Sequence, residues 1–341
     1  MKAVAQHMEI VGGGLAGLAL GLALRREGVP VTLFEAGDYP RQKVCGEFMA
    51  GLDEATIARL GLEPMLAGSL LHDRVAWFHR DRLILRQTLP EPAHAISRWT
   101  LDARLADAFV AAGGRLVPNT RVNPVHRAGR VIATGRPRAG LPWLGLKMHL
   151  RGLDLSAGLE LHLGRSAYVG ACALPGGEVN LCGLFRRQAL ASRSRRALMI
   201  SYLEACGLSS LAERVRAAET CEGSEAAVAG LGFGDQEGDE PGIAIGDARY
   251  TLPPFLGNGM AAALQMAAEA VEPLACWSQG DLSWPAVCAE VQERFRPRFR
   301  RRVSVGNFLH WFLLSPSPQS WVAGLARAHC LPTRLLYNVL H

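Results

Sequence analysis

Several familiar patterns are missing from this chain. None of its eight cysteines forms a C-x-x-C pair, which argues against a zinc site, a redox dithiol and a disulfide scaffold, so we expect no metal. Its arginines are not accompanied by a helix-turn-helix, zinc-finger or single-strand-binding pattern, so we expect no nucleic-acid partner. The uncharged stretch between Arg302 and Arg327 contains Pro316 and Pro318, which argue against a membrane-spanning helix. No small-residue cleavage site follows the apolar N-terminal stretch, so we expect a cytoplasmic protein.

The composition is typical of a folded enzyme. The 341 residues are 49% hydrophobic and 20% charged, values that fit a globular protein with one large core or two lobes. The formal net charge of +6 suits an acidic or phosphorylated ligand, an anionic membrane surface, or solubility alone. Charge therefore does not choose among these partners.

The first 35 residues predict a strand, a helix and a second strand. Residues 7–11 form an apolar run, residues 15–27 have the length and periodicity of a buried helix, and residues 31–35 are again apolar. Gly28 separates the helix from the second strand. This order is the βαβ unit of dinucleotide-binding folds.

Residues 12–17 (Gly-Gly-Gly-Leu-Ala-Gly) match G-x-G-x-x-G at the junction of the predicted strand and helix. Gly12 permits a tight turn, Gly14 lets a pyrophosphate approach the backbone, and Gly17 lets the helix pack closely on the strand. The helix N-terminus supplies amide groups and partial positive charge. Glu35 ends the second strand, where an acid accepts hydrogen bonds from the adenosine ribose. The expected dinucleotide contacts are Gly12, Gly14, Leu15, Ala16, Gly17 and Glu35.

The rest of the chain mixes both kinds of element. Helices are predicted at 53–62, 101–112, 195–206, 210–217 and 260–274. Strands are predicted at 75–78, 82–88, 115–118, 131–135, 146–150, 159–163, 166–174, 178–184 and 243–245. The strands between 146 and 184 follow one another across short turns and predict an antiparallel sheet. The strands at 115–118, 131–135 and 243–245 are expected to return to the first sheet.

A second motif lies far downstream, where residues 242–248 form a strand that ends at Asp247 and a Pro/Gly loop precedes an Ala-rich helix. This segment resembles the flavin-ribose motif of FAD proteins. The resemblance implies that the acid contacts the ribityl chain and that the loop passes beside the isoalloxazine, with helix-start amides stabilising negative charge on the reduced flavin. The matching positions are Asp247, Pro254, Gly257, Asn258, Gly259 and Met260.

Three further segments narrow the resemblance. The loop at 40–48, the helix led by Arg98, and the run from 168 to 184 are similar to the geranylgeranyl-reductase-like branch of the para-hydroxybenzoate-hydroxylase superfamily. The resemblance covers most of residues 7–275 and implies FAD as the cofactor. It implies that Arg41 and Arg98 contact flavin or phosphate, although each can also be a solvated surface arginine. Cys45 is expected beside the flavin, either redox active or as a packed thiol.

The chain also departs from its relatives. Flavoprotein hydroxylases of the superfamily carry an Asp-Gly pair where this chain has Ala-Thr-Gly at 133–135, which puts their linked FAD and NAD(P)H contacts in doubt here. No W-x-W-x-I-P stretch is present, which argues against a halogenase. A second G-x-G-x-x-G is also absent, so NADH or NADPH is expected to bind transiently as the reductant, or another protein supplies the electrons.

The predicted fold class is α/β, a doubly wound (Rossmann-like) FAD-binding domain with an inserted antiparallel β-sheet substrate domain and C-terminal helices. The expected domains are a discontinuous FAD-binding domain, a substrate domain and a C-terminal helical region. Their expected ranges are 1–72, 96–137 and 240–278 for the first, 73–95 and 138–239 for the second, and 279–341 for the third.

The leading functional hypothesis is a monooxygenase that uses NAD(P)H and oxygen to hydroxylate an aromatic or polyketide-like small molecule. The alternative is a reductase that saturates C=C bonds of an isoprenoid or lipid, suggested by Cys45-Gly46-Glu47 and the apolar C-terminus. A flavin-binding protein with decayed catalysis is an alternative of another class. Catalytic side chains are not assigned. Five residues on predicted strands can face a pocket or be ordinary sheet residues: His79, Lys147, His149, His162 and Tyr168.

The arginine-rich run from Arg294 to Arg302 precedes an aromatic, apolar segment at 305–314. A basic segment beside an amphipathic helix can rest on an anionic membrane and admit a hydrophobic substrate. The alternative is a C-terminal helix that closes the substrate lobe and leaves its arginines in water. The oligomeric state is left open.

Overall fold

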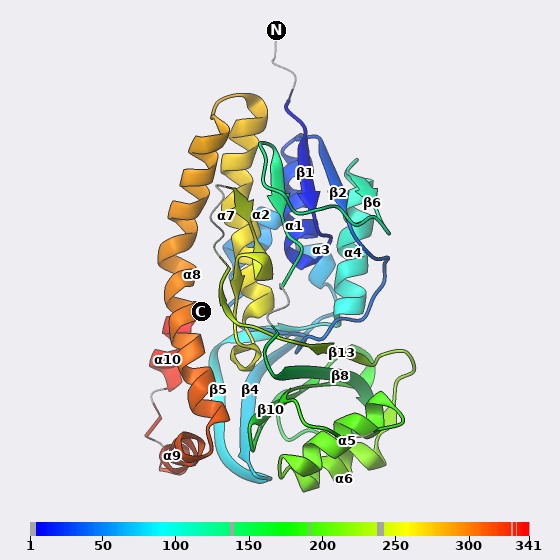
Figure 1. Cartoon of the computed structure of the whole chain (residues 1–341), viewed down its shortest axis with the longest axis vertical. Helices are drawn as coiled ribbons and strands as arrows, with labels where there is room; N and C mark the ends of the chain where they lie inside the picture. Colours follow the sequence, from blue (N-terminus) through cyan, green and yellow to red (C-terminus); the bar gives the residue numbers. More distant parts are fainter. Residues whose placement is uncertain are drawn as a thin grey trace.

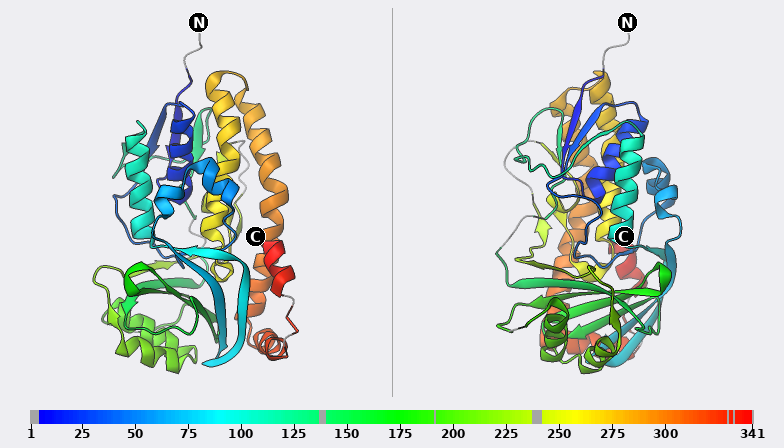
Figure 2. Two further views of the ribbon diagram at one scale, coloured as in Figure 1. Left: turned by 180° about the vertical axis from the view of Figure 1, so that it is seen from behind. Right: turned by 90° about the vertical axis from the view of Figure 1, so that its right-hand side faces the viewer.

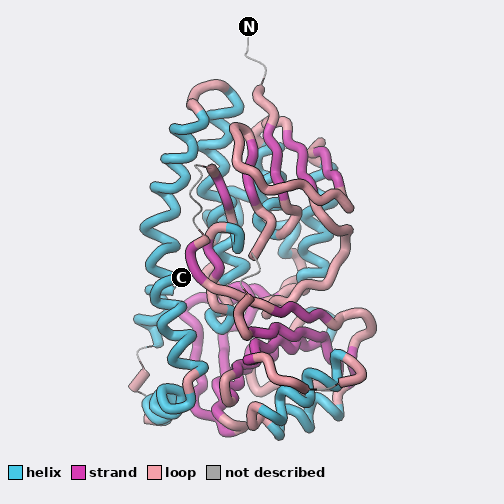
Figure 3. Tube along the Cα trace, viewed as in Figure 1, coloured by secondary structure: helices cyan, strands magenta, loops and turns pink. Residues whose placement is uncertain are grey.

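The computed structural model describes residues 5–136, 140–190, 192–236, 242–328, 330–331 and 333–340. Among the described residues it contains two large sheets, one above the other in Figure 1, a small two-stranded sheet, and a long C-terminal helix that runs beside both large sheets. Figure 3 shows that the helices gather around the upper sheet, along one side and beneath the lower sheet. Among the described residues, no helix is both long and apolar enough to cross a bilayer.

The upper sheet is parallel and is assembled from distant parts of the chain. Its strand order is β15-β7-β1-β2-β6, and every neighbouring pair is parallel. The strands are β1 (Met8–Val11), β2 (Val31–Phe34), β6 (Arg115–Val117), β7 (Arg130–Ile132) and β15 (Ile243–Ala244). The pairing of β15 with β7 confirms that the chain returns to its first sheet after the middle lobe.

Helix α1 (Leu15–Arg26) connects β1 to β2 and is the centre of the upper core. Its residues from Leu15 to Leu24 are all buried, because it lies between the sheet and two other helices, α4 (Arg98–Ala111) and α7 (Gly259–Gln279). A Cβ atom at Gly21 would lie 3.0 Å from the Phe109 ring, so a glycine permits the close approach of α1 and α4. The short helices α2 (Glu54–Leu60) and α3 (Glu63–Leu66) complete this layer (Figure 2).

The lower sheet has the strand order β12-β8-β11-β10-β9-β4-β5-β3, with β13 also pairing with β8. Its strands are β3 (Phe48–Met49), β4 (Leu70–His79), β5 (Arg82–Ala95), β8 (Trp143–Arg151), β9 (Leu159–Gly164), β10 (Ala167–Ala173), β11 (Glu178–Arg186), β12 (Glu219–Thr220) and β13 (Ala226–Ala229). Every pair is antiparallel except β4 with β9, which is parallel. The parallel pair joins the 70–95 hairpin to the predicted antiparallel sheet.

The lower sheet is covered differently on its two faces. Helices α5 (Arg195–Ala205) and α6 (Ser209–Ala217) pack beneath it, on alternate side chains such as Leu146, Met148 and Leu181. The intervening positions, among them Lys147 and Asn180, therefore point toward the upper sheet. This face carries Lys147, His149 and Asn180, whereas Glu160 on the opposite face pairs with Arg214 of α6.

The C-terminal helices are α8 (Trp284–Leu314), α9 (Pro316–Arg327) and α10 (Thr333–Leu340). The apolar segment predicted at 305–314 is the end of α8, which continues through Pro297 without a break. Phe295 and Phe299 on either side of this proline are buried against the upper core. Packing of α8 on α7 therefore outweighs the lost backbone hydrogen bond.

Most predicted elements are present, and the strands of the first hairpin are longer than expected. The strands predicted at 75–78 and 82–88 extend over Leu70–His79 and Arg82–Ala95. Short two-residue strands, β14 (Gly234–Asp235) and β16 (Tyr250–Thr251), were not predicted. The predicted domain boundaries at 1, 137–138, 239–240 and 341 lie outside the described residues, and the domain ranges stay a prediction.

Candidate functional site

The turn between β1 and α1 brings the glycine motif against the end of β7. Gly12 has φ +111°, and a Cβ atom there would lie 2.3 Å from the Ala133 carbonyl oxygen. A Cβ atom at Gly17 would lie 2.1 Å from the Gly12 carbonyl oxygen. Both glycines are therefore required by the fold itself. Gly14 differs, because a Cβ atom there would meet only the Lys43 ammonium, at 3.8 Å. The space in front of Gly14 is open.

Two long helices begin at this site without a capping side chain. Asp53, Ser97 and Ser283 cap α2, α4 and α8 through side-chain hydrogen bonds. Neither α1, which starts after Gly14, nor α7, which starts after Asn258, has such a hydrogen bond. Their first N–H groups lack the side-chain acceptors found at the starts of α2, α4 and α8, and an anionic group can accept from them.

Glu35 lies at the end of β2, as expected, and holds the glycine turn in place. Its two carboxylate oxygens accept hydrogen bonds from the backbone N–H groups of Gly13 at 2.8 Å and Gly37 at 2.9 Å. Arg41 donates to one of them at 3.1 Å. A carboxylate oxygen can accept more than one hydrogen bond, so both remain able to accept a ribose hydroxyl. Arg41 is exposed and pairs with Glu35.

A buried charge cluster faces the open space at Gly14. The Arg98 guanidinium binds the Asp102 carboxylate through two hydrogen bonds, at 2.7 and 2.8 Å, and Lys43 binds it at 3.2 Å. Burial lowers the pKa of Lys43. Burial opposes ionisation of Asp102, but Arg98 and Lys43 outweigh it and lower the pKa of this carboxyl. Two cations and one anion leave a net positive charge beside the α1 N-terminus, as a phosphate site requires.

The second motif reaches the first across the sheet. Gly246 lies in the turn Gly246–Ala248, and a Cβ atom there would lie 3.1 Å from the Ala16 Cβ. Asp247 is therefore held beside the start of α1, although the two motifs are far apart in sequence. Its carboxylate accepts a hydrogen bond from Arg136 at 2.9 Å and keeps part of its surface exposed. The structure thus brings the two motifs together as expected.

The Pro/Gly loop connects the upper core to the lower sheet. A 3-10 turn spans Pro254–Leu256, and Gly257 follows with φ +66° before α7 starts at Gly259. The Gly257 carbonyl oxygen accepts a hydrogen bond from Ala50 N–H at 3.0 Å, and a Cβ atom at Gly257 would lie 2.9 Å from the Phe48 ring. Met260 is buried in the upper core. Glycine at 257 is therefore needed for both conformation and space.

Cys45 lies between the charge cluster and the lower sheet. Its carbonyl oxygen accepts a hydrogen bond from the Asn180 side chain at 2.9 Å. Burial raises the pKa of the Cys45 thiol. A raised pKa disfavours the reactive thiolate, so the structure favours the packed thiol over the redox-active one.

Lys147 and His149, two of the five residues named from predicted strands, share a partner that the sequence did not reveal. Lys147 Nζ lies 3.1 Å from Glu47 Oε1, and His149 Nε2 lies 2.6 Å from Glu47 Oε2. All three side chains are buried. On its other side, His149 Nδ1 lies 3.3 Å from Glu178 Oε2. Glu178 and His149 line a pocket of about 560 Å³ between the two large sheets. The contacts from Lys147 through Glu47 and His149 to Glu178 therefore end at this pocket.

The other three residues named from predicted strands, His79, His162 and Tyr168, do not contact Glu47, Lys147 or His149 in the hydrogen bonds and ion pairs of the described residues. His162 pairs with Glu160 at 3.1 Å and stacks on Phe78. The Tyr168 hydroxyl lies 3.4 Å from His310 Nδ1, and burial raises the pKa of Tyr168 well above its usual value. His79 is buried at the end of β4. These three are packing residues of the lower sheet.

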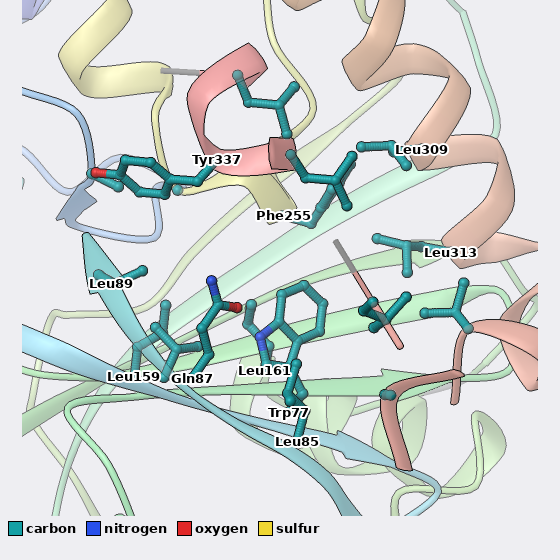
Figure 4. Close-up of a pocket in the computed structure, with 18 of the residues that line it drawn as sticks. Trp77, Leu85, Gln87, Leu89, Leu159, Leu161, Phe255, Leu309, Leu313 and Tyr337 are labelled. Atoms are coloured by element: carbon teal, nitrogen blue, oxygen red, sulfur yellow. The ribbon is translucent and has the colours of Figure 1, made fainter. Parts of the chain in front are cut away.

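An apolar cavity of about 180 Å³ opens beneath the Pro/Gly loop (Figure 4). Phe48, Phe255 and Gly257 form its wall toward the upper sheet, and side chains of β4, β5 and β9 such as Trp77, Leu85 and Leu161 form its floor. Helices α8, α9 and α10 close the remaining side. Gln87, Trp77 and Tyr337 supply the polar atoms of its lining. Among the described residues, none accepts a hydrogen bond from Trp77 Nε1.

The arginine run divides into two sets. Arg294, Arg298 and Arg302 bind α7 or α2: Arg294 pairs with Glu272, Arg298 with Glu269 and Asp53, and Arg302 with Gln265. The other three, Arg296, Arg300 and Arg301, are exposed. Half of the run therefore fixes α8 to the upper core, which the sequence did not indicate.

Sequence comparison gives partial matches. The family model described as an NAD(P)-binding Rossmann-like domain matches residues 10–41, which hold the glycine motif and Glu35. A menaquinone reductase from Mycolicibacterium smegmatis is 30% identical over 130 residues, which are 36% of this chain and 32% of that protein. The chain thus matches about a third of the length of this curated relative.

Comparison with solved structures covers almost the whole chain. HpxO of Klebsiella pneumoniae, a variant complexed with FAD, gives a TM-score of 0.77 at 14% identity, over 98% of this chain and 97% of that one. PqsL of Pseudomonas aeruginosa, described as a probable FAD-dependent monooxygenase, gives 0.70 at 16% identity, over 93% and 99%. The chain has the fold of the FAD-dependent monooxygenases. A geranylgeranyl bacteriochlorophyll reductase-like protein from Thermoplasma acidophilum has it too, with 0.71 at 14% identity, over 94% and 92%.

These comparisons confirm the predicted fold class, a Rossmann-like FAD-type sheet with a separate antiparallel sheet and C-terminal helices. They do not test the individual contact residues. Lys43, Asp102 and Glu47 were not assigned to the site from the sequence, although all three lie in the segments of family resemblance. Lys43 and Glu47 flank Cys45 in the loop of family resemblance, and their charge was the only available signal.

Proposed function

We propose that this protein is an FAD-dependent oxidoreductase that acts on a hydrophobic small molecule. The observation that carries the proposal is the meeting of three features at one place: two uncapped helix starts, the cationic cluster of Lys43 and Arg98, and an apolar cavity that ends at Gly257. The pyrophosphate suits the open space at Gly14, and the flavin suits the loop beside the cavity. The FAD contacts expected from the sequence stay a prediction.

Each part of the site has a task that follows from its geometry. Bound FAD would supply the redox chemistry, accepting a hydride and passing on its electrons. The N–H groups at the start of α7 stabilise negative charge that develops near Gly257. The apolar lining excludes water from the reacting atoms, and Trp77 Nε1 can donate to a ligand oxygen. Glu47, Lys147 and His149 form a buried polar cluster at the end of the 40–48 loop.

The leading candidate reaction is monooxygenation. NAD(P)H gives a hydride, one oxygen atom of O₂ enters the substrate as a hydroxyl group, and the other leaves as water after uptake of one proton and the hydride's electrons. The full-length likeness to FAD-dependent monooxygenases supports this candidate. The nicotinamide cofactor binds transiently, since the sequence carries no second dinucleotide motif.

A second candidate is reduction of a C=C bond of an isoprenoid or other lipid. A hydride from the reduced cofactor and a proton add across the double bond, and no oxygen is consumed. Two observations favour it: apolar side chains dominate the cavity lining, and part of the chain is similar to a menaquinone reductase. A flavin-binding protein without turnover is the remaining alternative.

An oxygen electrode separates these candidates. Purified holoprotein with NADPH or NADH is offered menaquinone or 2-aminobenzoylacetate, the small molecule bound in a PqsL structure, and substrate products are examined after turnover in ¹⁸O₂. Monooxygenation predicts substrate-dependent oxygen uptake and ¹⁸O in the product. Reduction predicts a product that carries two additional hydrogen atoms and forms without oxygen uptake. Flavin that neither nucleotide reduces, with no product from either compound, would contradict both enzymatic candidates and support the third.

We also propose that the protein works in the cytoplasm and touches the membrane from its surface. Support comes from the basic C-terminal sequence and from the apolar cavity, whose ligands dissolve better in lipid than in water.

A further inference from the structure

Four large apolar side chains are exposed near the end of α8 and on α9. Phe308 is 59% exposed, Trp311 58%, Trp321 74% and Leu325 46%. They belong to two helices that pack on each other. We call these four residues the aromatic patch. A group of exposed Trp and Phe side chains indicates a surface that binds another protein or a membrane.

The charged side chains of the C-terminal segment that carries the aromatic patch are all positive. From Arg294 to the C-terminus the sequence has no Asp or Glu. The exposed Arg300 and Arg301 lie on the same side of α8 as Phe308 and Trp311, because spacings of seven and eleven residues are close to two and three helical turns. A partner with negative charge above an apolar layer matches this arrangement, and that is the profile of an anionic bilayer.

The inner side of the same helices forms the wall of the cavity. Leu309, Phe312 and Leu313 of α8 and Val322 and Ala326 of α9 line it. One layer of helices therefore separates the cavity from the aromatic patch. A ligand that leaves a bilayer at this surface has to pass only α8 and α9 to enter the cavity.

We propose that the aromatic patch and the outer arginines Arg300 and Arg301 dock the protein on an anionic lipid surface. The indole rings insert at the level of the headgroups, where Trp is favoured, and the guanidinium groups bind lipid phosphates. A second copy of this chain fits this surface less well, because a two-fold interface would place the arginines of both copies opposite one another. Resting on the proposed function, this docking makes the substrate a membrane-resident lipid.

Vesicle sedimentation of the full-length holoprotein tests the docking. Wild-type protein is expected to sediment with vesicles of equal phosphatidylcholine and phosphatidylglycerol, and at least roughly tenfold less with phosphatidylcholine alone. Trp311→Ser with Trp321→Ser is expected to lower binding to the anionic vesicles by a further factor of about ten or more. Trp99→Ser is the matched control, because Trp99 is also exposed, at 42%, but lies on α4.

Arg300→Gln with Arg301→Gln tests the charged part separately. This variant is expected to lose the preference for phosphatidylglycerol while keeping its flavin spectrum and unfolding temperature. Equal sedimentation of wild type, patch variant and Trp99 control would overturn the proposal. So would a wild-type dimer in sedimentation velocity that the patch variant abolishes without any vesicle binding. The flavin content is measured in the same samples, so loss of FAD and loss of docking are distinguished.

Discussion

The Lys147 ammonium lies 3.1 Å from the Glu47 carboxylate, and neither side chain is exposed to solvent. Lys147 stands on β8 of the lower sheet, whereas Glu47 follows the loop that leaves the upper sheet. The pair therefore fixes the lower sheet beneath the 40–48 loop. Both charges are buried, so each is stabilised by the other; Lys147 also donates to Gln42, and Glu47 also contacts His149.

Glu47→Gln is expected to destabilise the protein by about 3 kcal/mol or more, because it leaves the buried Lys147 charge with neutral side chains such as Gln42 and no carboxylate. Glu47→Leu combined with Lys147→Met is expected to recover much of this loss, since it removes both charges. Denaturant unfolding measures the change in free energy. Glu204→Gln, which breaks an exposed ion pair with Arg216, is the control and should cost under about 1 kcal/mol. Equal effects of the Glu47 and Glu204 variants would refute this prediction.

Gly14→Val is expected to abolish FAD binding without unfolding the protein. The backbone at Gly14 is extended, and the space that a side chain would enter holds only the Lys43 ammonium. A valine there fills the proposed pyrophosphate position. Isothermal titration of the apoprotein with FAD measures the loss, and thermal unfolding of the apoprotein measures the fold. Gly324→Ala on α9, where a Cβ atom also meets open space, should leave FAD binding unchanged.

Lys43→Met is expected to weaken FAD binding by roughly 10- to 100-fold, the value of a hydrogen bond to a charged group. Asp102 keeps its two hydrogen bonds from Arg98, so the apoprotein should stay folded. Titration with FAD at low and high salt is the measurement. Arg59→Gln serves as the control, because Arg59 pairs with Glu272 on the surface. An unchanged dissociation constant in the Lys43 variant would place the pyrophosphate elsewhere.

Leu161→Phe is expected to reduce binding of an apolar ligand by tenfold or more while the flavin spectrum is kept, because Leu161 lies on the floor of the cavity. The fluorescent probe N-phenyl-1-naphthylamine reports binding. Leu71→Phe changes an exposed leucine of the same sheet and should have no effect. Undiminished probe binding in the Leu161 variant would show that ligands do not use this cavity.

His310 makes stability depend on pH. Burial lowers the pKa of His310 from 6.5 to about 4, so the neutral ring is favoured in the folded state. Its contribution is fully present above pH 6.5 and is lost as the pH falls toward 4, with a total of about 3 kcal/mol. His310→Phe is expected to remove this part of the pH dependence. Unfolding free energies of both proteins at pH 7 and pH 4 test it, and parallel losses in the two would contradict it.

The sequence predicts the upper sheet well because its signals are local. The glycine turn, the buried helix after it and the acid at residue 35 stand within one short segment, and each has one physical explanation. The downstream motif was also recognisable, since a strand ending at Asp247 and a Pro/Gly loop are again local features. Their meeting at Ala16 and Gly246 follows from the parallel pairing of β15 with β7.

The rest of the site depends on pairs that are distant in sequence. Glu47 meets Lys147 and His149 only because β8 passes beneath the loop at 40–48, and no periodicity announces that crossing. From the sequence, the arginine run from Arg294 to Arg302 was interpreted as one surface feature. Acids on α7 such as Glu269 and Glu272 bind part of it, and this became visible only once α8 lay against α7.

The absorption spectrum of the purified protein tests the central claim most directly. Bound FAD at about one equivalent per chain, lost in Gly14→Val and kept in Gly324→Ala, is the predicted result. Protein without flavin that also fails to bind added FAD would contradict the account.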